Sequence, residues 1–382
     1  MKRIAVYGAT GSVGSQALDV VRRCRGLLRI GLMSCHDQVD RLAEAANAMR
    51  PEQLVVTSAC ADIGRLESLL DYSPDIMAGP DSLLASVGAA SCDLALNAVP
   101  GIDGLPLLAA CLEAGLPTAL ANKESIVSGG EVIRTLWRST GTPIYPVDSE
   151  HAAIYECLGD SFDSSRAETL WLTASGGPFL HADAAAMENA TVTEALQHPT
   201  WNMGRKISVD SATMANKGLE VIEARYLFDV PADRIRVVIQ PTSVVHSMVT
   251  FRDTTVLAQL GAPDMRVPIE RALLGRQAGR HPLASPIDFW EIGSVEFLRP
   301  DFARFPCLEL AYTALAAGET AVYCAADDAA VQLFLEERVR FGQIPELIRE
   351  ALTAFQGRHP RDVAGILELD SAVHGYVKGL LT

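Results

Sequence analysis

The sequence lacks long apolar runs, paired cysteines and an excess of basic charge, and each absence excludes a class of protein. No stretch approaches the ~18 unbroken apolar residues of a membrane-spanning helix, and the run after Met1-Lys2-Arg3 is too short for a signal peptide. The formal net charge of −15 argues against nucleic acid and anionic membrane as partners, because such a surface repels both. None of the eight cysteines belongs to a CxxC pair, so neither a zinc knuckle nor a redox motif is indicated. We expect a cytoplasmic globular protein whose cysteines are mostly buried and reduced.

The first part of the chain has the pattern of an α/β domain. Residues 3–147 alternate short apolar runs with amphipathic stretches, which predicts a doubly wound parallel sheet with helices on both faces. The expected strands are 3–7, 28–33, 53–57, 94–98 and 118–121, and expected helices include 15–24 and 39–49. The length of 382 residues leaves room for one or two further domains.

After residue 147 strands and helices mix irregularly. Residues 237–239, 244–251 and 256–260 predict antiparallel strands of a second sheet. Residues 175–205 are rich in Gly, Pro, His and polar side chains with weak periodicity, which is typical of a long lid loop. From about residue 306 the pattern is helical and predicts a small C-terminal bundle.

A glycine-rich motif follows the first expected strand and opens the first helix. It reads Gly8-Ala9-Thr10-Gly11-Ser12-Val13-Gly14, a GxxGxxG variant of the dinucleotide-binding fingerprint. Glycines let the backbone approach a pyrophosphate, and the helix N-terminus offers N–H donors and a positive dipole. After the second strand, Ser34 and His36 suit a 2′-phosphate whereas Asp37 suits a ribose hydroxyl, so the choice between NAD and NADP stays open.

Carboxylates gather in two further motifs. In Val147-Asp148-Ser149-Glu150-His151, an extended backbone would place Asp148 and Glu150 on one side, where hard oxygens suit Mg²⁺ or Mn²⁺. In isolation that spacing is more typical of a solvated acidic turn. On a helix starting near Asp210 and Ser211, the side chains of Asn216, Lys217 and Glu220 share one face. Such a face suits phosphate binding and a further metal ligand, although Lys217 and Glu220 alone would suggest a surface ion pair.

Other polar side chains follow expected strands or lie in the expected lid. Lys123 follows the strand ending at Ala121, where ligands of open α/β sheets bind, but a surface lysine fits equally well. Ser175 precedes a Gly-Gly-Pro turn and offers a hydroxyl for phosphate. His198, Trp201 and Met203 give the lid large side chains that a loop needs only if it closes over something. His246 lies in an expected strand and is as typical of a core histidine as of a site.

Seven motifs occur in a recognisable order along the chain: GATGSVG, ALANKESIV, PVDSEHAAI, LTASGGPF, HPTWNMGRKISVDSATMANKGLE, PTSVVHSMV and LAQLGAPDMR. Together they resemble the successive motifs of the 1-deoxy-D-xylulose 5-phosphate reductoisomerase family. The resemblance implies a homodimeric, NADPH-dependent and Mg²⁺- or Mn²⁺-dependent enzyme. Its reaction would isomerise and reduce this sugar phosphate to 2-C-methyl-D-erythritol 4-phosphate, for isoprenoid precursor biosynthesis. It also implies the domains: an NADPH-binding Rossmann-like domain (1–147), an α+β catalytic and dimerisation domain (148–275), a linker (276–300) and a helical domain (301–382).

The resemblance also implies roles for individual residues. Metal ligands would be Asp148, Glu150 and Glu220. Substrate contacts would come from Lys123, Ser149 and Glu220, with the phosphate held by Ser175, Ser211, Asn216 and Lys217, and the lid closed by His198 and Trp201. Cofactor contacts would come from the glycine-rich loop, Ser34, His36, Asn122, Glu124, Met203, Gly204 and Met265. Residues in or beside the reacting centre would be Lys123, Glu150, His151, His198 and His246.

Four segments depart from the family pattern. Cys35-His36-Asp37 replaces Gly-Lys-Asn, which bears on the choice of NADPH over NADH. Pro100-Gly101-Ile102-Asp103-Gly104 replaces a more apolar Gly-Ala-Ala-Gly region, and Gln240 stands where His is common. Cys324-Ala325-Ala326-Asp327-Asp328 replaces Asn-Ala-Ala-Asn-Glu, which we expect to affect how the bundle packs.

Two other interpretations compete with the family. One is a different NAD(P)-dependent sugar or polyol phosphate dehydrogenase, which would oxidise an alcohol without a metal. The other is a nucleotide-sensing regulatory protein, which would be expected to have lost residues at the chemical positions. Asp148, Glu150, Glu220 and Lys123 are all present, which favours an enzyme.

Overall fold

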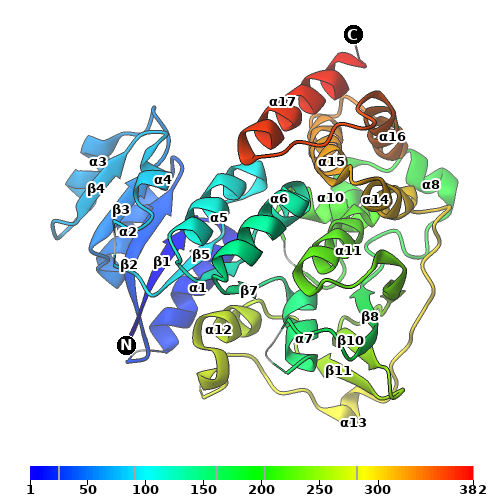
Figure 1. Ribbon diagram of the computed structural model, residues 1–382, viewed down its shortest axis with the longest axis horizontal. Helices are drawn as coiled ribbons and strands as arrows, with labels where there is room; N and C mark the ends of the chain where they lie inside the picture. Colours follow the sequence, from blue (N-terminus) through cyan, green and yellow to red (C-terminus); the bar gives the residue numbers. More distant parts are fainter. Residues whose placement is uncertain (25, 90, 160–161, 202, 281–282, 382) are drawn as a thin grey trace. The chain divides into compact units, whose positions relative to one another are not determined.

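The structure is a computed structural model that describes residues 1–24, 26–89, 91–159, 162–201, 203–280 and 283–381 (Figure 1). The chain forms two compact units. The first contains residues 1–125, 133–152 and 264–285; the second contains residues 126–132, 153–263 and 286–382. Each unit is therefore built from separate stretches of the chain. Among the described residues, no helix combines the length and apolar character needed to span a bilayer.

A parallel sheet forms the centre of the first unit. Within the described residues it has seven strands in the order β4-β3-β2-β1-β5-β6-β7, and all neighbouring strands in this order run parallel. The strands are β1 (Lys2–Tyr7), β2 (Leu28–Cys35), β3 (Gln53–Val56), β4 (Asp75–Ala78), β5 (Leu94–Asn97), β6 (Thr118–Leu120) and β7 (Ile144–Pro146). The order reverses between β1 and β5, and ligands of open α/β sheets bind outside the carboxyl ends of strands at such a switch point. The predicted doubly wound α/β domain is confirmed.

Helices connect these strands because parallel neighbours need a crossover. They are α1 (Ser12–Arg23), α2 (Val39–Met49), α3 (Ile63–Leu69), α4 (Ser82–Ala85), η1 (Gly101–Asp103), α5 (Gly104–Glu113), α6 (Glu124–Thr140) and α7 (Ser149–Cys157). The last two continue into the second unit, as residues 126–132 and 153–157 belong there. Inside α6 the chain kinks at Gly130, whose φ of 44° favours glycine.

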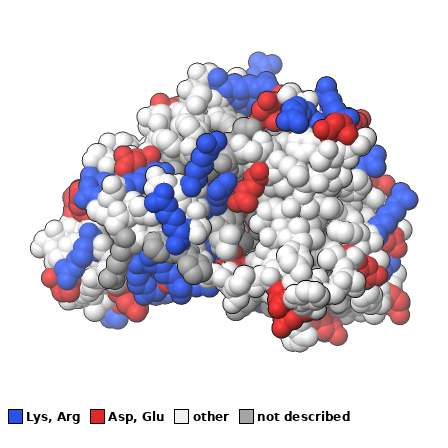
Figure 2. Space-filling view, turned by 90° about the horizontal axis from the view of Figure 1, so that it is seen from below, with Lys and Arg blue, Asp and Glu red and all other residues white. Residues whose placement is uncertain are grey.

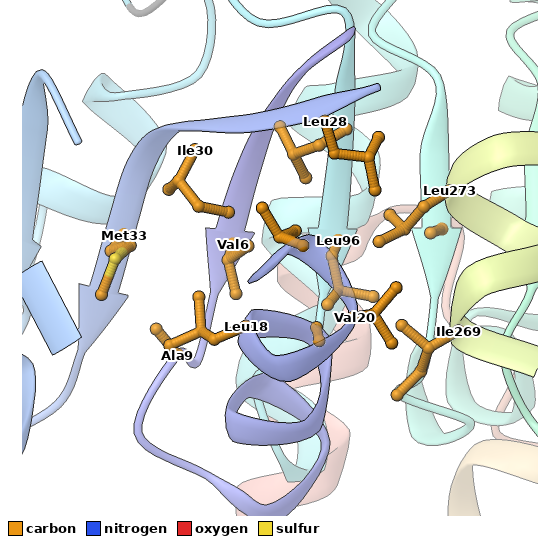
Figure 3. Packing of buried hydrophobic residues seen from close by; sticks show 14 of the residues in the cluster. Val6, Ala9, Leu18, Val20, Leu28, Ile30, Met33, Leu96, Ile269 and Leu273 are labelled. Atoms are coloured by element: carbon orange, nitrogen blue, oxygen red, sulfur yellow. The ribbon is translucent and has the colours of Figure 1, made fainter. Parts of the chain in front are cut away.

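One face of the sheet packs on helices from two distant parts of the sequence. Val6 of β1 and Leu96 of β5 lie beside Val20 of α1 in a continuous buried cluster. Ile269 and Leu273 of α12 (Arg266–Leu274) complete that cluster, as Figure 3 shows. Lys2 Nζ donates a hydrogen bond of 2.7 Å to the carbonyl oxygen of Leu273. Residues 264–285 therefore lie in the first unit, whereas the sequence placed 148–275 in the second domain and 276–300 in a linker.

A mixed sheet forms one layer of the second unit. Within the described residues its order is β11-β10-β8-β9, formed by β8 (Ala167–Ala174), β9 (Ile235–Ile239), β10 (Val245–Phe251) and β11 (Val256–Leu260). The strands β8, β10 and β11 pair antiparallel, as expected. The expectation that the strand at 237–239 is also antiparallel is wrong, because β9 runs parallel to β8. The connection between β8 and β9 carries the lid segment and two helices.

Helices make up the rest of the second unit. They are α8 (Ala184–Glu188), α9 (Val192–Ala195), α10 (Arg205–Thr213), α11 (Ala215–Phe228), η2 (Ala232–Arg234), α13 (Phe289–Ile292), α14 (Pro306–Ala317), α15 (Thr320–Leu335), η4 (Phe341–Gln343), α16 (Ile344–Ala354) and α17 (Val363–Gly379). A further turn of 3-10 helix, η3 (Gly275–Gln277), follows α12 in the first unit. The helices α14 to α17 form the predicted C-terminal bundle (orange to red in Figure 1). The expected lid loop at 175–205 is interrupted by α8 and α9.

Candidate functional site

The glycine-rich loop leads from β1 into α1 at the switch point of the parallel sheet. A Cβ atom at Gly8 would lie 2.4 Å from the carbonyl oxygen of Ala98, and one at Gly14 would lie 2.1 Å from the carbonyl oxygen of Gly8. Gly11 caps the N-terminus of α1 without any side-chain hydrogen bond. The backbone packing excludes side chains at Gly8 and Gly14, and the N-terminus of a helix such as α1 favours an anionic group.

The end of β2 supplies the residues that the sequence associated with a 2′-phosphate. Ser34 is buried, and its Oγ accepts a hydrogen bond of 2.9 Å from the N–H of Gly8. This serine therefore holds the glycine-rich loop in place. His36 is exposed, and its Nδ1 lies 2.9 Å from Oγ1 of Thr57 at the end of β3. His36 and Thr57 thus form a polar pair at the carboxyl edge of the sheet.

Asn122 organises the turn after β6. Its Nδ2 donates to the carbonyl oxygen of Gly101 at 2.8 Å and to Oε2 of Glu124 at 3.0 Å, and its Oδ1 accepts from the N–H of Ser125 at 2.8 Å. A Cβ atom at Gly104 would lie 2.7 Å from Cγ of Asn122. The departure at Pro100–Gly104 therefore packs directly against Asn122, and Asn122 and Glu124 position the chain on either side of Lys123.

Lys123, Asp148 and His151 form a charged cluster at the carboxyl ends of β6 and β7. Nζ of Lys123 lies 2.9 Å from Oδ2 of Asp148, and Nδ1 of His151 lies 3.3 Å from Oδ1 of Asp148. Lys123 and His151 are both buried. Burial alone would raise the pKa of Asp148, but Lys123 and His151 outweigh it and hold that pKa well below its usual value. Asp148 is therefore an anion, fixed in place by two neighbours.

Ser149 and Glu150 lie in the first turn of α7. The extended conformation considered for Val147–His151 is wrong, because Asp148 precedes the helix and its carbonyl oxygen accepts from the N–H of Ala152 at 2.9 Å. Oδ1 of Asp148 lies 3.3 Å from the N–H of Glu150, and Oγ of Ser149 donates to Oε2 of Glu150 at 2.6 Å. Two carboxylates and a hydroxyl at one helix start are hard oxygen donors, which fit Mg²⁺ or Mn²⁺.

In the second unit, Ser175 and His198 join the end of β8 to the lid segment. Nδ1 of His198 accepts hydrogen bonds from the backbone N–H groups of Thr200 and Trp201 at 3.1 and 2.9 Å. Its proton must then be on Nε2, which lies 2.9 Å from Oγ of Ser175. Burial lowers the pKa of His198, which favours this neutral form. Ser175 Oγ also accepts from the N–H of Gly177 at 3.2 Å, so its own proton can be donated to a ligand.

The indole of Trp201, in the lid segment, lies beside the imidazole of His246 in β10. Their ring centroids are 6.4 Å apart with an angle of 53° between the ring planes. His246 is buried in β10, and a Cβ atom at Gly261 would lie 3.2 Å from its Nε2. Met203 is half-buried after the lid, Gly204 caps α10, and Met265 caps α12 in the first unit. The indole of Trp201 is thus held against an element of the sheet.

Of the phosphate-binding residues predicted on α10 and α11, Ser211 lies next to the turn after Ser175. A Cβ atom at Gly177 would lie 2.7 Å from the carbonyl oxygen of Ser211, so this turn packs on the end of α10. On α11, Nδ2 of Asn216 donates to Oε1 of Glu220 at 2.6 Å, and Nζ of Lys217 donates to Oε2 at 2.5 Å. Lys217 and Glu220 are buried, which makes this pair an internal one and not the surface ion pair considered as an alternative.

Glycine fixes the position of α11. A Cβ atom at Gly218 would lie 2.6 Å from Cβ of Ala311 on α14 and 2.9 Å from the hydroxyl of Tyr323. The helix therefore rests directly on its neighbours at the residue between Lys217 and Glu220. Hydrogen bonds from Asn216 and Lys217 thus orient the two oxygens of the Glu220 carboxylate.

Sequence reasoning missed several residues that shape these sites. Thr57 was not singled out, although its position after a parallel strand next to β2 is a usable signal. Gln240 departs from the family pattern, and here it is fully buried with Oε1 accepting from the N–H of Val244 at 2.8 Å. Lys206 and Asp327 form a buried ion pair of 2.9 Å across 121 residues of sequence, which no local pattern predicts.

Comparisons with known proteins cover almost the whole chain. Family models described as 1-deoxy-D-xylulose 5-phosphate reductoisomerase match residues 4–130, and models of that enzyme's C-terminal domain match residues 144–228 and 260–376. The reductoisomerase of Laribacter hongkongensis is 42% identical over 99% of this chain and 98% of its own. That of Geobacillus sp. is 41% identical over 100% of both.

Solved structures of the same enzyme have the same fold. The Zymomonas mobilis reductoisomerase in complex with NADPH has a TM-score of 0.92 and 34% identity, covering 100% of this chain and 99% of the other. A reductoisomerase in complex with NADPH, fosmidomycin and magnesium also has a TM-score of 0.92, with 35% identity and coverage of 100% and 98%. With relatives this similar over their full length, the chain belongs to the 1-deoxy-D-xylulose 5-phosphate reductoisomerase family.

Proposed function

We propose that the protein isomerises 1-deoxy-D-xylulose 5-phosphate and reduces it with NADPH to 2-C-methyl-D-erythritol 4-phosphate, in isoprenoid precursor biosynthesis. Family membership over nearly the full chain supports this reaction. The structural observation that carries it is the buried Lys123–Asp148 pair at the same carboxyl edge of the sheet as the glycine-rich loop. This arrangement provides an ionised carboxylate and a fixed ammonium group at the place where a substrate beside the bound NADPH would react.

We further propose that Asp148, Glu150 and Glu220 bind one divalent cation, Mg²⁺ or Mn²⁺. Solved relatives contain magnesium, and the donors here are carboxylate oxygens, which Mg²⁺ prefers. When bound, the cation supplies Lewis-acid polarisation of a substrate carbonyl oxygen. Lys123 and His151 keep Asp148 ionised and oriented, and Ser149 orients Glu150. The chain thus holds its ligands in place before the cation arrives, as a metal site requires.

The first unit supplies the proposed NADPH site. Its loop of Gly8, Thr10, Gly11, Ser12, Val13 and Gly14 would hold the pyrophosphate, because backbone N–H groups and the start of α1 favour anions. His36 with Thr57 would contact the 2′-phosphate, while Ser34 holds the loop through its hydrogen bond from the N–H of Gly8. Asn122, Glu124 and Met265 of this unit would line the remainder, and Met203 and Gly204 of the second unit are also proposed to contact the cofactor. NADPH supplies the hydride, and Lys123 orients the substrate oxygen on which negative charge develops.

The second unit supplies the proposed site for the substrate phosphate. Ser175, Ser211, Asn216 and Lys217 offer hydroxyl, amide and ammonium donors, and Ser175 has its proton available. Anchoring the phosphate fixes the orientation of the reacting carbons at the other end of the substrate. His198 and Trp201 belong to a segment that would cover the bound substrate and exclude water. His246 supports that segment through its contact with Trp201.

The first experiment is a turnover assay with the purified protein. NADPH absorbance is followed with 1-deoxy-D-xylulose 5-phosphate in the presence and absence of Mg²⁺ or Mn²⁺, and repeated with NADH. We expect cation-dependent oxidation of NADPH and formation of the methylerythritol phosphate product. Turnover that does not depend on the cation would favour a simple polyol phosphate dehydrogenase. No turnover by the folded protein under any combination would favour a regulatory protein.

We also propose that the protein is a homodimer formed through the edge of the second sheet. In the described part of the chain β11 pairs only with β10, and Val256 and Leu257 on this edge strand are 51% and 46% exposed. Figure 2 shows a broad area without charged side chains in its right half. Phe289 and Trp290 of α13, in the same unit, are also exposed. Open apolar edge strands favour pairing with another chain, which a two-fold symmetric dimer provides.

Light scattering on an edge variant tests the dimer. Leu257→Lys places a charge on the open strand and should shift the molar mass from two chains to one. Leu84→Lys is the matched control, because Leu84 is 44% exposed but lies in the first unit. An unchanged dimer in Leu257→Lys would exclude this edge as the interface.

We place the protein in the cytoplasm, because its eight cysteines are all free and most are buried.

A further inference from the structure

A buried cluster of three charged side chains lies in the second unit. Nζ of Lys206 donates to Oδ2 of Asp210 at 2.7 Å and to Oδ2 of Asp327 at 2.9 Å. Asp210 and Asp327 are 3% and 0% exposed, whereas the lysine side chain is 25% exposed. One ammonium group therefore bridges two buried carboxyl groups that come from different helices.

This cluster connects α10 to the C-terminal bundle. Lys206 lies in the first turn of α10, directly after the lid segment that carries His198 and Trp201. Asp210 is one turn further along and is followed at once by Ser211. Asp327 lies in the middle of α15, within the segment Cys324–Asp328 where the chain departs from the family pattern. The end of the lid and the proposed phosphate site are thus tied to the bundle by one ion pair.

Holding two helices together with buried charged groups costs free energy of desolvation. Burying ions costs several kcal/mol each, and well-packed apolar side chains often stabilise a fold as well. Here two buried carboxyl groups lie next to one ammonium group. The titratable and charged groups that face Asp327 are Lys206 and Asp210 from α10, Cys307 from α14, and Tyr323, Cys324 and Asp328 from its own helix. Burial raises the pKa of Asp327, although Lys206 opposes the shift.

Unlike apolar packing, an ion pair with hydrogen bonds requires a defined geometry between its groups. The charge-assisted hydrogen bond from Lys206 to Asp327 joins α10 to α15, and the bond from Lys206 to Asp210 within α10 orients the lysine for it. The position of α10 matters for Ser211, because Gly177, two residues after Ser175, packs on the carbonyl oxygen of Ser211. A shift of α10 would therefore move Ser211 away from Ser175 and release the start of the helix next to the lid.

We propose that Asp327, acting through Lys206, is a positioning residue that sets the affinity for the substrate phosphate by fixing α10 to α15. This inference rests on the proposed function, since it assigns Ser175 and Ser211 to the phosphate of the substrate. Asp327 touches neither substrate nor cofactor. Asp327 lies in the second unit, so the glycine-rich loop and His36 of the first unit are expected to keep their contacts in its variants.

The test compares four forms of the full-length protein by steady-state kinetics with Mg²⁺ present. Asp327→Ala removes the acceptor on α15, and we expect the substrate KM to rise about tenfold with a smaller effect on kcat, as for other displaced binding groups. Asp327→Asn keeps an oxygen acceptor for Lys206 and should restore the substrate KM to within about twofold of the wild type. Asp328→Ala is the matched control, because it removes the neighbouring carboxylate on α15, which accepts from Gln332 and lies 3.5 Å from Nε2 of His374. The NADPH KM should be the same in all four.

The outcomes separate this inference from the proposed function. No turnover of 1-deoxy-D-xylulose 5-phosphate by the wild type would refute the proposed function itself. An active wild type with an unchanged substrate KM in folded Asp327→Ala would refute the positioning role. Equal increases of the substrate and NADPH KM would indicate general damage and also refute it. Should Asp327→Ala not fold, Asp327→Val fills the space with apolar atoms and carries the same expectations.

Discussion

Nε2 of His198 lies 2.9 Å from Oγ of Ser175, while its Nδ1 accepts two backbone N–H groups of the lid segment. The imidazole therefore does two tasks at once: one nitrogen shapes the turn at Thr200 and Trp201, and the other orients the hydroxyl proposed to bind phosphate. Accepting at Nδ1 requires the neutral ring, whose single proton is then on Nε2 and is donated to Ser175 Oγ. The lid segment and the phosphate site are coupled through this single protonation state.

That coupling predicts a loss of substrate affinity in acid. Because burial lowers the pKa of His198, the neutral form is favoured in the folded protein. Its contribution is present above the ordinary histidine pKa of about 6.5 and is lost as the pH falls through the lowered value. We expect kcat/KM for the substrate to fall below about pH 6 at saturating NADPH and metal.

The substrate phosphate also titrates in this range, with a second pKa of about 6. A variant separates the two effects. His198→Gln offers amide donor and acceptor groups but does not titrate, so its profile should retain only the step due to the phosphate. Identical pH profiles for the variant and the wild type would contradict the role of His198.

Glu220→Gln tests the proposed metal ligand on α11. The amide keeps the shape of the side chain but removes its charge, and we expect kcat to fall by at least the ~100-fold that residues supporting metal ligands can cost. NADPH affinity, measured by fluorescence titration, should be unchanged because the glycine-rich loop lies in the other unit. Glu168→Gln, on the exposed side of β8, is the control. Near-normal activity of Glu220→Gln at ordinary Mg²⁺ concentration would remove Glu220 from the ligand set.

Lys217→Ala tests the proposed phosphate site. Loss of a charge-assisted hydrogen bond of about 1.5–3 kcal/mol corresponds to an increase of about ten- to a hundredfold in the substrate KM. Arg225→Ala serves as the comparison, since Arg225 lies on the same helix but pairs with Asp229 at 2.8 Å. If both variants show the same small change, Lys217 does not contact the phosphate.

His36→Ala tests the choice between NADPH and NADH. The imidazole and Thr57 are the polar groups found at the end of β2 and β3, so their loss should raise the NADPH KM by about tenfold. The NADH KM should not change, because NADH has no 2′-phosphate. Asp37→Asn gives the opposite comparison: if Asp37 holds a ribose hydroxyl, this variant should weaken NADH binding and spare NADPH.

The alternating pattern of the first domain was sufficient to predict its sheet, because strands buried on both faces are short apolar runs bounded by turns. β4 was missed, since it begins with Asp75, is only partly buried and lies at the edge of the sheet. The start of α7 was misjudged, although an Asp before Ser149 and Glu150 is a typical helix N-cap signal. This error concerned the backbone and not the choice of Asp148 and Glu150.

Other features depend on contacts between distant segments, which local patterns do not encode. The direction of β9 against β8 and the pairing of Lys206 with Asp327 both follow from tertiary packing. Motifs nevertheless identified Ser175, His198 and Ser211, which the structure brings together through one hydrogen bond and the packing of Gly177. Their residue types were informative because charged and polar groups are seldom buried without a task.

The helix α12 gives the first unit an unusual order of synthesis. Its core residues Ile269 and Leu273 are made after nearly all of the second sheet, yet they cover Val20 and Leu96 near the beginning of the chain. A growing chain on the ribosome can form the parallel sheet early, but it leaves that apolar face uncovered until about residue 285 has emerged. Expression of residues 1–152 alone would produce the same unfinished surface, which is prone to aggregate. The nucleotide-binding half is the first part of the protein to be translated and one of the last to be completed.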